Sequence, residues 1–329
     1  MTAKIEDVAR AAGVSIMSVS RAMRGVEGVS EKTRARIEAE ARRLGYQPSR
    51  LAGALTQENS TLIGVSVPTL FDAVFAEILD GMGPTLAAAG LETVIETTEY
   101  DPAREEAFVD RMSRWNPAAI ILTGVDHSDD VRRRLGAATC PVMEIWDITD
   151  DPIDLCVGID QFEAGRKTGA AMVERGYRRP AFVASKGIRD TRAEKRENGF
   201  AAAFAGTGAA RLISLRASGL SQFEIGYAGA EQAVEAGADL IYFLNDHLAF
   251  GGLMAVAAKG VRCPEDIGIV GFNGLRLNEV LPRRLTTAIT PRKVMGATAA
   301  RRLVARINRV AAPKITQLPV EIEFGETTR

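Results

Sequence analysis

The chain has 329 residues, of which 46% are hydrophobic and 25% are charged, and its formal net charge is −1. This composition is typical of a water-soluble protein with room for two or three domains. No run approaches the roughly eighteen apolar residues of a transmembrane helix, and residues 1–13 are charged where a signal peptide would be apolar. We therefore expect no membrane partner and a location in the cytoplasm.

Catalytic and metal chemistry is not indicated by the sequence. Cys140, Cys156 and Cys263 lack the paired spacing of a disulfide framework or a zinc site, so we expect buried thiols. His127 and His247 are the two histidines, and neither belongs to a Ser/His/Asp or metal-spaced cluster. No Walker loop or paired dinucleotide motif occurs. The sequence thus predicts a protein that is not an enzyme and needs no cofactor.

The first fifteen residues predict a helix followed by a tight turn. Ile5, Val8, Ala9 and Ala12 recur at the spacing of one buried helix face. Gly13 stands where a helix end favours a left-handed residue, so a new helix is expected to begin just after it. The resulting pair of short helices is typical of a helix-turn-helix unit.

The second helix is expected to present a polar, basic face to DNA. Val19 and Met23 point inward in this arrangement, and Ser15 caps the amino end of the helix. Such a face suits the major groove, with early residues at base edges and Ser and Arg side chains at phosphates. The outward residues are Ser15, Ile16, Met17, Ser18, Ser20 and Arg21.

A third helix is predicted from the cap Ser30 to the stop Gly45, with Ile37, Ala41 and Leu44 on its buried face. Residues 1–60 hold ten Lys/Arg against seven Asp/Glu, a local charge of +3, which leaves −4 for the remainder. Phosphate attraction depends on the local patch rather than on the sum. By helix pattern alone, however, any short helix pair with a Gly turn would look alike.

Several short sequence motifs in this segment resemble those of the LacI/GalR family of bacterial transcription regulators. The matching stretches are Asp7-Val8-Ala9, Ala12-Gly13-Val14-Ser15, Ser18-Val19-Ser20-Arg21, Val29-Ser30, Thr33-Arg34 and Leu44-Gly45-Tyr46-Gln47-Pro48. The resemblance implies an operator-binding headpiece over residues 1–48. It adds Arg24, Ser30, Thr33, Tyr46 and Arg50 to the expected DNA-binding residues.

Residues 49–60 are predicted to be a linker that is too short for a stable helix by itself. In the family this segment pairs with its two-fold mate in the minor groove, where a leucine wedges open a base step. By that resemblance Leu55 is the wedge and Ala52 lies beside it. Without the resemblance, Leu55 would be a leucine that packs between domains.

From residue 61 onward, short apolar runs alternate with amphipathic stretches, which predicts parallel sheets covered by helices on both faces. Pro84 is expected to kink the first of these helices. The expected strands are 62–67, 91–96, 118–122, 142–146, 156–159, 180–184, 212–215, 240–244 and 267–272. The expected helices are 74–89, 103–113, 162–175, 190–204, 221–236, 247–259 and 293–308.

These strand-helix units are more numerous than a single sheet accommodates comfortably. We therefore expect an α/β domain of two subdomains over residues 61–329. The arrangement resembles the periplasmic sugar-binding fold that the family carries behind its headpiece. The subdomains are assigned to 61–160 with 291–317, and to 161–290 with 318–329. Ligands of open α/β sheets bind beyond the carboxyl ends of the strands, so the cleft between the subdomains is the expected effector site.

Polar residues at strand ends are the candidates for effector binding. Asn245, Asp246, Asn273 and Arg196 match positions where the family binds sugar hydroxyls, although Asn245 or Asp246 could simply cap a helix and Asn273 could shape a loop. Phe75, Thr123, Trp146 and Asp147 complete the expected set.

Two departures from the family's residue pattern, together with several short sequence motifs, favour a sugar acid as the effector. Asn273 stands in place of the usual aspartate, and Trp146 stands where many members have an acid. The stretches 75–79, 115–116 and 290–292 resemble the gluconate-repressor branch of the family. A sugar acid needs a cation for its carboxylate, which Arg196 with Lys195 or Arg192 could supply.

The sequence therefore predicts a dimeric repressor that binds a palindromic operator and is controlled by a small sugar or sugar acid. Two alternatives remain: a sugar-binding protein without a role on DNA, and an enzyme on the same scaffold.

Overall fold

The computed structural model describes residues 3–23, 26–46, 60–71, 73–187 and 190–329. The expected DNA contacts Arg24 and Arg50, the linker residue Ala52 and the expected wedge Leu55 lie outside the described residues. The chain divides into two compact units, Met1–Ser60 and Thr61–Arg329, which are described separately below. The first unit is helical and the second is α/β, so the predicted fold class is confirmed.

The first unit contains the three predicted helices α1 (Ile5–Ala12), α2 (Ile16–Met23) and α3 (Glu31–Leu44). Val8, Val19 and Ile37, one from each helix, are fully buried in its small core. Gly13 has φ 61°, and its N–H bonds the last carbonyls of α1, as the helix-turn-helix pattern predicts. The amino end of α1 has no side-chain cap from Lys4, but Asp7 accepts a hydrogen bond from the Lys4 N–H at 2.9 Å.

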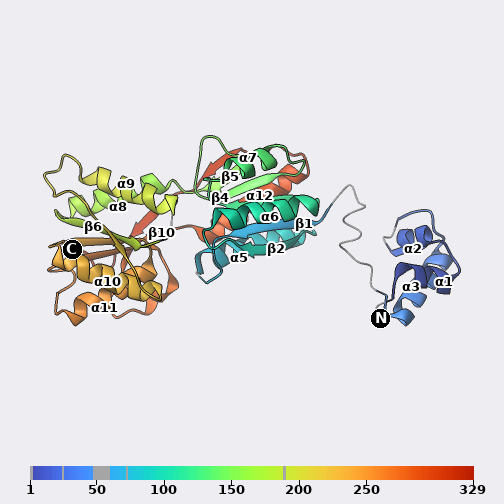
Figure 1. Cartoon of the computed structure of the whole chain (residues 1–329), viewed down its shortest axis with the longest axis horizontal. Coiled ribbons are helices and arrows are strands. Elements are labelled where there is room, and N and C mark those ends of the chain that lie inside the picture. The colour runs from blue at the N-terminus through green and yellow to red at the C-terminus, as the bar shows by residue number, and fades with distance from the viewer. Residues whose placement is uncertain (1–2, 24–25, 47–59, 72, 188–189) are drawn as a thin grey trace. The chain divides into compact units, whose positions relative to one another are not determined.

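Two six-stranded sheets form the second unit, and each belongs to one subdomain (Figure 1). The first sheet has the order β11-β5-β4-β3-β1-β2 and is parallel throughout. Its strands are β1 (Leu62–Val67), β2 (Glu92–Thr97), β3 (Ala119–Thr123), β4 (Val142–Trp146), β5 (Leu155–Gly158) and β11 (Ile315–Gln317).

The second sheet has the order β12-β10-β9-β8-β6-β7 and is parallel except for β12, which pairs antiparallel with β10. Its strands are β6 (Pro180–Ser185), β7 (Ile213–Ala217), β8 (Leu240–Phe243), β9 (Gly268–Asn273), β10 (Thr286–Ile289) and β12 (Glu321–Glu323). The chain passes between the subdomains after β5, after β10 and after β11.

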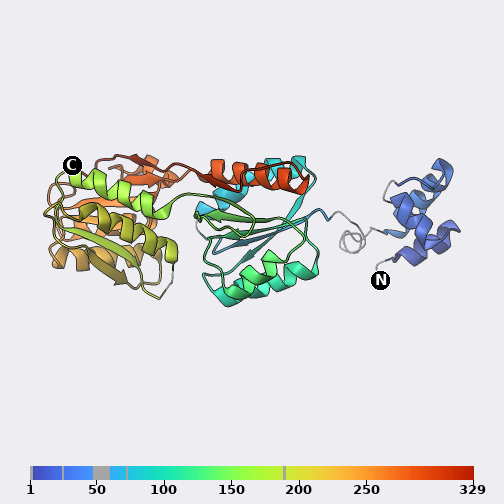
Figure 2. The same cartoon turned by 90° about the horizontal axis from the view of Figure 1, so that it is seen from above.

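Helices cover both faces of each sheet. Figure 2 shows α5 (Ala73–Ala88) beside α12 (Arg292–Ile307) on one face of the first sheet, with α6 (Pro102–Arg114) and α7 (Asp129–Gly136) on the other. In the second subdomain α8 (Gln161–Glu174) packs with α9 (Thr191–Phe204), and α10 (Gln222–Glu235) packs with α11 (Asp246–Ala258). A 3-10 helix, η1 (Arg276–Val280), follows β9. Pro84 lies inside α5, which continues through it.

Two further expectations concern the cysteines and membranes. All three cysteines are free; Cys156 and Cys263 are buried, and Cys140 is half-buried. Among the described residues, no helix combines the length and apolar character that a membrane span requires.

Three of the helix pairs in this unit, α8 with α9, α10 with α11, and α5 with α12, are each brought together by two glycines that face the partner backbone. A Cβ atom added at Gly199 of α9 would lie 1.9 Å from the Phe162 carbonyl oxygen, and one at Gly165 of α8 would lie 2.0 Å from the Arg196 carbonyl oxygen. Gly226 with Gly251 and Gly81 with Gly296 repeat this arrangement in the other two pairs. The close approach packs α9 tightly against α8. Helix α9 contributes Ala193 and Glu194 to the cavity described below.

We predict that Gly199→Ala lowers the free energy of unfolding of the α/β unit by about 1 to 3 kcal/mol, because the added methyl group overlaps a backbone oxygen that cannot move away. The matched control is Gly136→Ala at the end of α7, where a Cβ meets nothing within 4 Å. That control should be neutral or slightly stabilising. Urea denaturation of the full chain measures both changes, and equal effects of the two variants would contradict this packing.

Candidate functional site

The predicted DNA-reading face of α2 is exposed. Ile16 and Met17 are 48% and 59% exposed, whereas Val19 on the opposite side is fully buried. Ser15 and Arg21 are also exposed, and Ser18 and Ser20 are half-buried. Exposed apolar side chains beside hydroxyl groups and a guanidinium match the donors and methyl contacts that a major-groove edge requires.

Other residues assigned to DNA also hold the headpiece together. The Ser30 hydroxyl accepts a hydrogen bond from the Thr33 N–H at 3.3 Å, which caps α3. Tyr46 packs against the core, and burial, followed by the nearby Glu6 charge, raises the pKa of its hydroxyl. Arg34, which is outside the predicted DNA-binding set, donates to the Ala22 and Val26 carbonyls and so links α3 to the end of α2.

Two cavities open between the loops at the carboxyl ends of the strands in the α/β unit. The first cavity, of about 320 Å³, lies between the loops after β1 and β2 of one subdomain and β6, α9 and α10 of the other. The second cavity, of about 480 Å³, lies between the loops after β2 and β3 and the start of α9. Pro68, Tyr100 and Asp190 line both cavities. Each is in the size range in which proteins bind small ligands.

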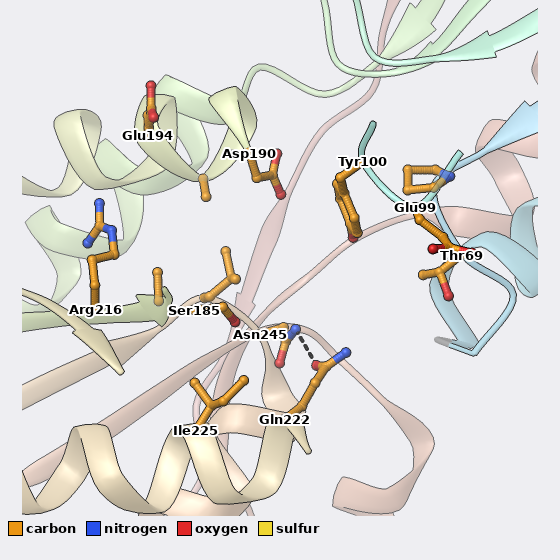
Figure 3. Close-up of a pocket in the computed structure, with 14 residues that line it drawn as sticks. Thr69, Glu99, Tyr100, Ser185, Asp190, Glu194, Arg216, Gln222, Ile225 and Asn245 are labelled. Atoms are coloured by element: carbon orange, nitrogen blue, oxygen red, sulfur yellow. Dashed lines mark hydrogen bonds between the residues drawn. The ribbon is translucent and has the colours of Figure 1, made fainter. Parts of the chain in front are cut away.

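Two of the eight predicted effector residues line these cavities. Asn245 lines the first, where its Nδ2 donates to Gln222 Oε1 at 2.7 Å (Figure 3). Its Oδ1 accepts from the Leu248 N–H at 3.0 Å, so Asn245 also caps α11. Thr123 lines the second cavity and donates to the Ser66 carbonyl at 2.8 Å.

Arg196 is buried, at 4% exposed, and is not among the residues that line either cavity. Its guanidinium donates to Gln161 Oε1 and to the Leu244 carbonyl oxygen, and it lies 4.1 Å from the centroid of the Phe272 ring. Within the described part of the chain it forms no ion pair, and its Nε has no hydrogen-bond partner. Burial therefore lowers the pKa of this guanidinium from its ordinary value.

Asp246 and Asn273 are buried at the same strand ends but are not among the residues that line the two cavities. Asp246 accepts hydrogen bonds from Thr287 Oγ1 and from the Leu275 N–H, both at 2.6 Å. Burial raises the pKa of its carboxyl to about 7 against the opposing effect of these donors. Asn273 has φ 113°, and its Oδ1 is buried without a hydrogen-bond partner among the described residues.

Phe75, Trp146 and Asp147 belong to the first subdomain and are not among the residues that line the two cavities. The rings of Phe75 and Trp146 meet edge to face with centroids 5.9 Å apart. Asp147 is 1% exposed and accepts from Lys195 Nζ at 2.6 Å, an ion pair that joins the two subdomains. The Lys195 ammonium group is therefore already ion-paired, whereas the Arg196 guanidinium forms no ion pair with the described residues.

Several cavity residues were missed in the sequence. Tyr100, Ser185 and Gln222 line the first cavity, and Tyr100 has a positive φ of 61°. Ser185 ends β6, so the rule that ligands bind at strand ends could have identified it. Tyr100 lies three residues beyond β2 in a tight turn, for which no strand or helix pattern gave a signal.

A buried histidine, His127, lines the second cavity and lies between two carboxylates. His127 Nδ1 is 2.7 Å from Glu105 Oε1, and its Nε2 is 3.4 Å from Glu144 Oε1. Burial lowers the pKa of His127, but both carboxylates raise it by more, to about 9. His127 therefore carries a positive charge at neutral pH and joins α6 to β4.

Comparison with known proteins gives the class of this chain. A family model described as bacterial regulatory proteins, lacI family, matches residues 4–49. A second, described as periplasmic binding proteins and sugar binding domain of LacI family, matches residues 60–324. The HTH-type transcriptional regulators GntR and IdnR of Escherichia coli strain K12 are 33% and 30% identical to this chain; each alignment covers 98% of it, and 97% and 98% of the respective relative.

Solved structures agree with this assignment. A LacI family transcriptional regulator from Silicibacter pomeroyi superposes with a TM-score of 0.91 and 36% identity over 99% of this chain and all of that chain. The lac repressor dimer bound to operator and an anti-inducer superposes with a TM-score of 0.81 at 22% identity, over 100% of this chain and 99% of that one, which shows the shared fold. A helix-turn-helix unit before a sugar-binding unit defines a DNA-binding, ligand-responsive transcription regulator. The chain belongs to the LacI family of bacterial regulatory proteins, as its sequence motifs predict.

The pH dependence of stability tests the buried histidine. Because the pKa of His127 is raised above its ordinary 6.5 to about 9, its stabilisation is complete below pH 6.5 and is lost as the pH rises through about 9. Between pH 6.5 and 10 the wild type should lose up to about 3 kcal/mol more unfolding free energy than His127→Gln. Denaturation series of both proteins at each pH measure the difference. Parallel pH profiles would contradict the charged triad.

Proposed function

We propose that this protein is a repressor that binds a palindromic operator as a homodimer and acts in the cytoplasm. Its effector, by this proposal, is a sugar acid of the gluconate type that binds between the subdomains. The observation that supports this effector class is the buried Arg196 guanidinium, which forms no ion pair with any residue that the structure describes.

The argument for an anion is energetic. A buried charge without a counter-ion is costly, and the cost is removed when a ligand carboxylate supplies paired, charge-assisted hydrogen bonds. Of the predicted effector residues, Asn245 is an amide at the wall of the first cavity, which also carries the carboxylates of Glu99, Asp190 and Glu194. Amides donate to and accept from hydroxyl groups without repelling an anion.

The exposed face of α2 supports DNA binding, and an exposed apolar surface supports pairing. Phe223 of α10 and Met254 of α11 are 46% and 61% exposed on two helices that pack together. A single headpiece contacts little DNA, so two copies related by a two-fold axis fit a palindromic site.

The switch in this proposal is a change in the angle between the subdomains. The Lys195–Asp147 ion pair and a hydrogen bond of 2.6 Å from Thr191 Oγ1 to Asp126 hold the two sides together in this structure. A ligand that favours one angle shifts the population, provided that its affinity differs between the two states. The linker residues 49–60 would carry that change to the headpieces.

We predict that Arg21→Ala weakens binding to a duplex selected by the protein from a random pool by about tenfold and reduces the salt slope by about one. Met17→Ala should instead relax base preference and leave the slope unchanged. Arg43→Ala is the matched control, since Arg43 pairs with Glu40 on α3. Fluorescence anisotropy over a salt series measures all three, and a protein that selects no duplex would refute the proposed function.

We predict that Arg196→Gln abolishes the response of operator binding to gluconate and related sugar acids. Operator affinity without ligand should stay within about twofold, because Arg196 belongs to the other unit of the chain. Arg196→Lys, which keeps the charge without the planar fork, should respond more weakly than the wild type. Retention of the full response in Arg196→Gln would remove the proposed role of this residue, and joint loss of operator binding and thermal stability would indicate a folding role.

A further inference from the structure

A buried amide, that of Gln161, contacts the Arg196 guanidinium. Gln161 is the first residue of α8 and is 1% exposed. Its Oε1 accepts a hydrogen bond from Arg196 Nη1, and its Nε2 donates to the Trp146 carbonyl oxygen at 3.0 Å. The reverse orientation of the amide would set donor against donor and acceptor against acceptor, so these two partners fix it. The close helix packing at Gly165, one turn further along α8, brings the two side chains together.

Two buried carboxylates act on Arg196, and each already has a cation of its own. They are Asp190 and Asp147. Asp190 Oδ1 accepts a hydrogen bond from Arg192 Nε at 2.8 Å, and Asp147 Oδ2 accepts one from Lys195 Nζ at 2.6 Å. The side chain that touches the Arg196 guanidinium by hydrogen bonding is thus a neutral amide, whereas its two cationic neighbours are held by carboxylates.

One residue separates Arg196 from the first cavity. Its Nη2 donates at 3.3 Å to the carbonyl oxygen of Leu244, which lines that cavity. Glu99 and Glu194, in the walls of the same cavity, are exposed, so water and salt screen their charges. A buried guanidinium is screened much less. Of these charges, that of Arg196 therefore acts over the longer range.

We propose that Gln161 determines the charge selectivity of the effector site. Its neutral amide fixes the Arg196 guanidinium without cancelling the charge, which is left for the carboxylate of a sugar acid. A carboxylate in the same place would pair with Arg196 internally and remove the preference for an anionic ligand. Gln161 is a positioning residue, because it acts through Arg196. This inference rests on the proposed function and adds the residue that sets the ligand charge.

The variant Gln161→Glu tests this inference, because it replaces an amide nitrogen by an oxygen and keeps the length of the side chain. Calorimetric titration of the full chain with gluconate and with glucitol, a neutral analogue, measures charge selectivity as the ratio of two affinities. In Gln161→Glu the affinity for gluconate should fall at least about tenfold, while that for glucitol stays within about threefold.

Gln161→Met is the matched control. It also loses the hydrogen bond to the Trp146 carbonyl oxygen, but it adds no charge, so it should still prefer gluconate to glucitol. Loss of the preference in Gln161→Met would overturn the inference, whether or not Gln161→Glu folds. Retention of the wild-type preference in Gln161→Glu would overturn it as well, while the proposed sugar-acid effector stands. If the wild type binds no sugar acid, the proposed function fails and this inference fails with it.

A double-mutant cycle measures the same pairing without any ligand. In urea denaturation, Gln161→Glu should lower the unfolding midpoint less in the wild-type background than in Arg196→Gln, where the new carboxylate is buried without a cation. Equal losses in the two backgrounds would show that no ion pair forms and would overturn the inference.

Discussion

The buried guanidinium of Arg196 is the feature on which the proposed binding of an anionic effector depends. It contacts a glutamine, a backbone carbonyl and an aromatic ring, none of which carries a charge. A charge in this state favours an incoming anion over a neutral ligand of the same shape. The close packing of α9 on α8 through Gly165 and Gly199 fixes the backbone from which Arg196 extends.

Helix α9 links the proposed effector site to the contacts between the two subdomains. Thr191 and Lys195, at the start of α9, contact Asp126 and Asp147 of the opposite subdomain, and Arg196 lies one residue further along. Asp147 is nearly fully buried, so its ion pair with Lys195 is less screened by water and salt than a surface pair. A ligand beside Arg196 therefore acts next to the contacts that any change of angle must break or form.

The sequence predicted most of the fold because apolar periodicity is strong where strands and helices are buried. The predicted strand 142–146 agrees with β4 at both ends, and the predicted helix 190–204 agrees with α9 within one residue. Helix α7 was missed because its eight residues are mostly charged, and β10 was missed because Thr286 and Thr287 interrupt the apolar run. Both are short elements whose position is determined by tertiary packing rather than by local pattern.

The candidate site was harder to predict, since strand ends indicate where side chains begin but not how deeply they lie. Asn245 and Thr123 reach the cavities, whereas Asp246 turns inward to Thr287 and the Leu275 N–H. Its burial could not be predicted because both partners lie about thirty or more residues away in sequence. Tyr100 depends on the conformation of one tight turn, which a single sequence does not specify.

The most direct test of an anionic ligand site is a calorimetric comparison of gluconate with glucitol, which has the same carbon chain and an alcohol in place of the carboxylate. If the unpaired charge of Arg196 selects the ligand, gluconate should bind at least about a hundredfold more tightly than glucitol. Equal affinities for the two compounds would contradict the account.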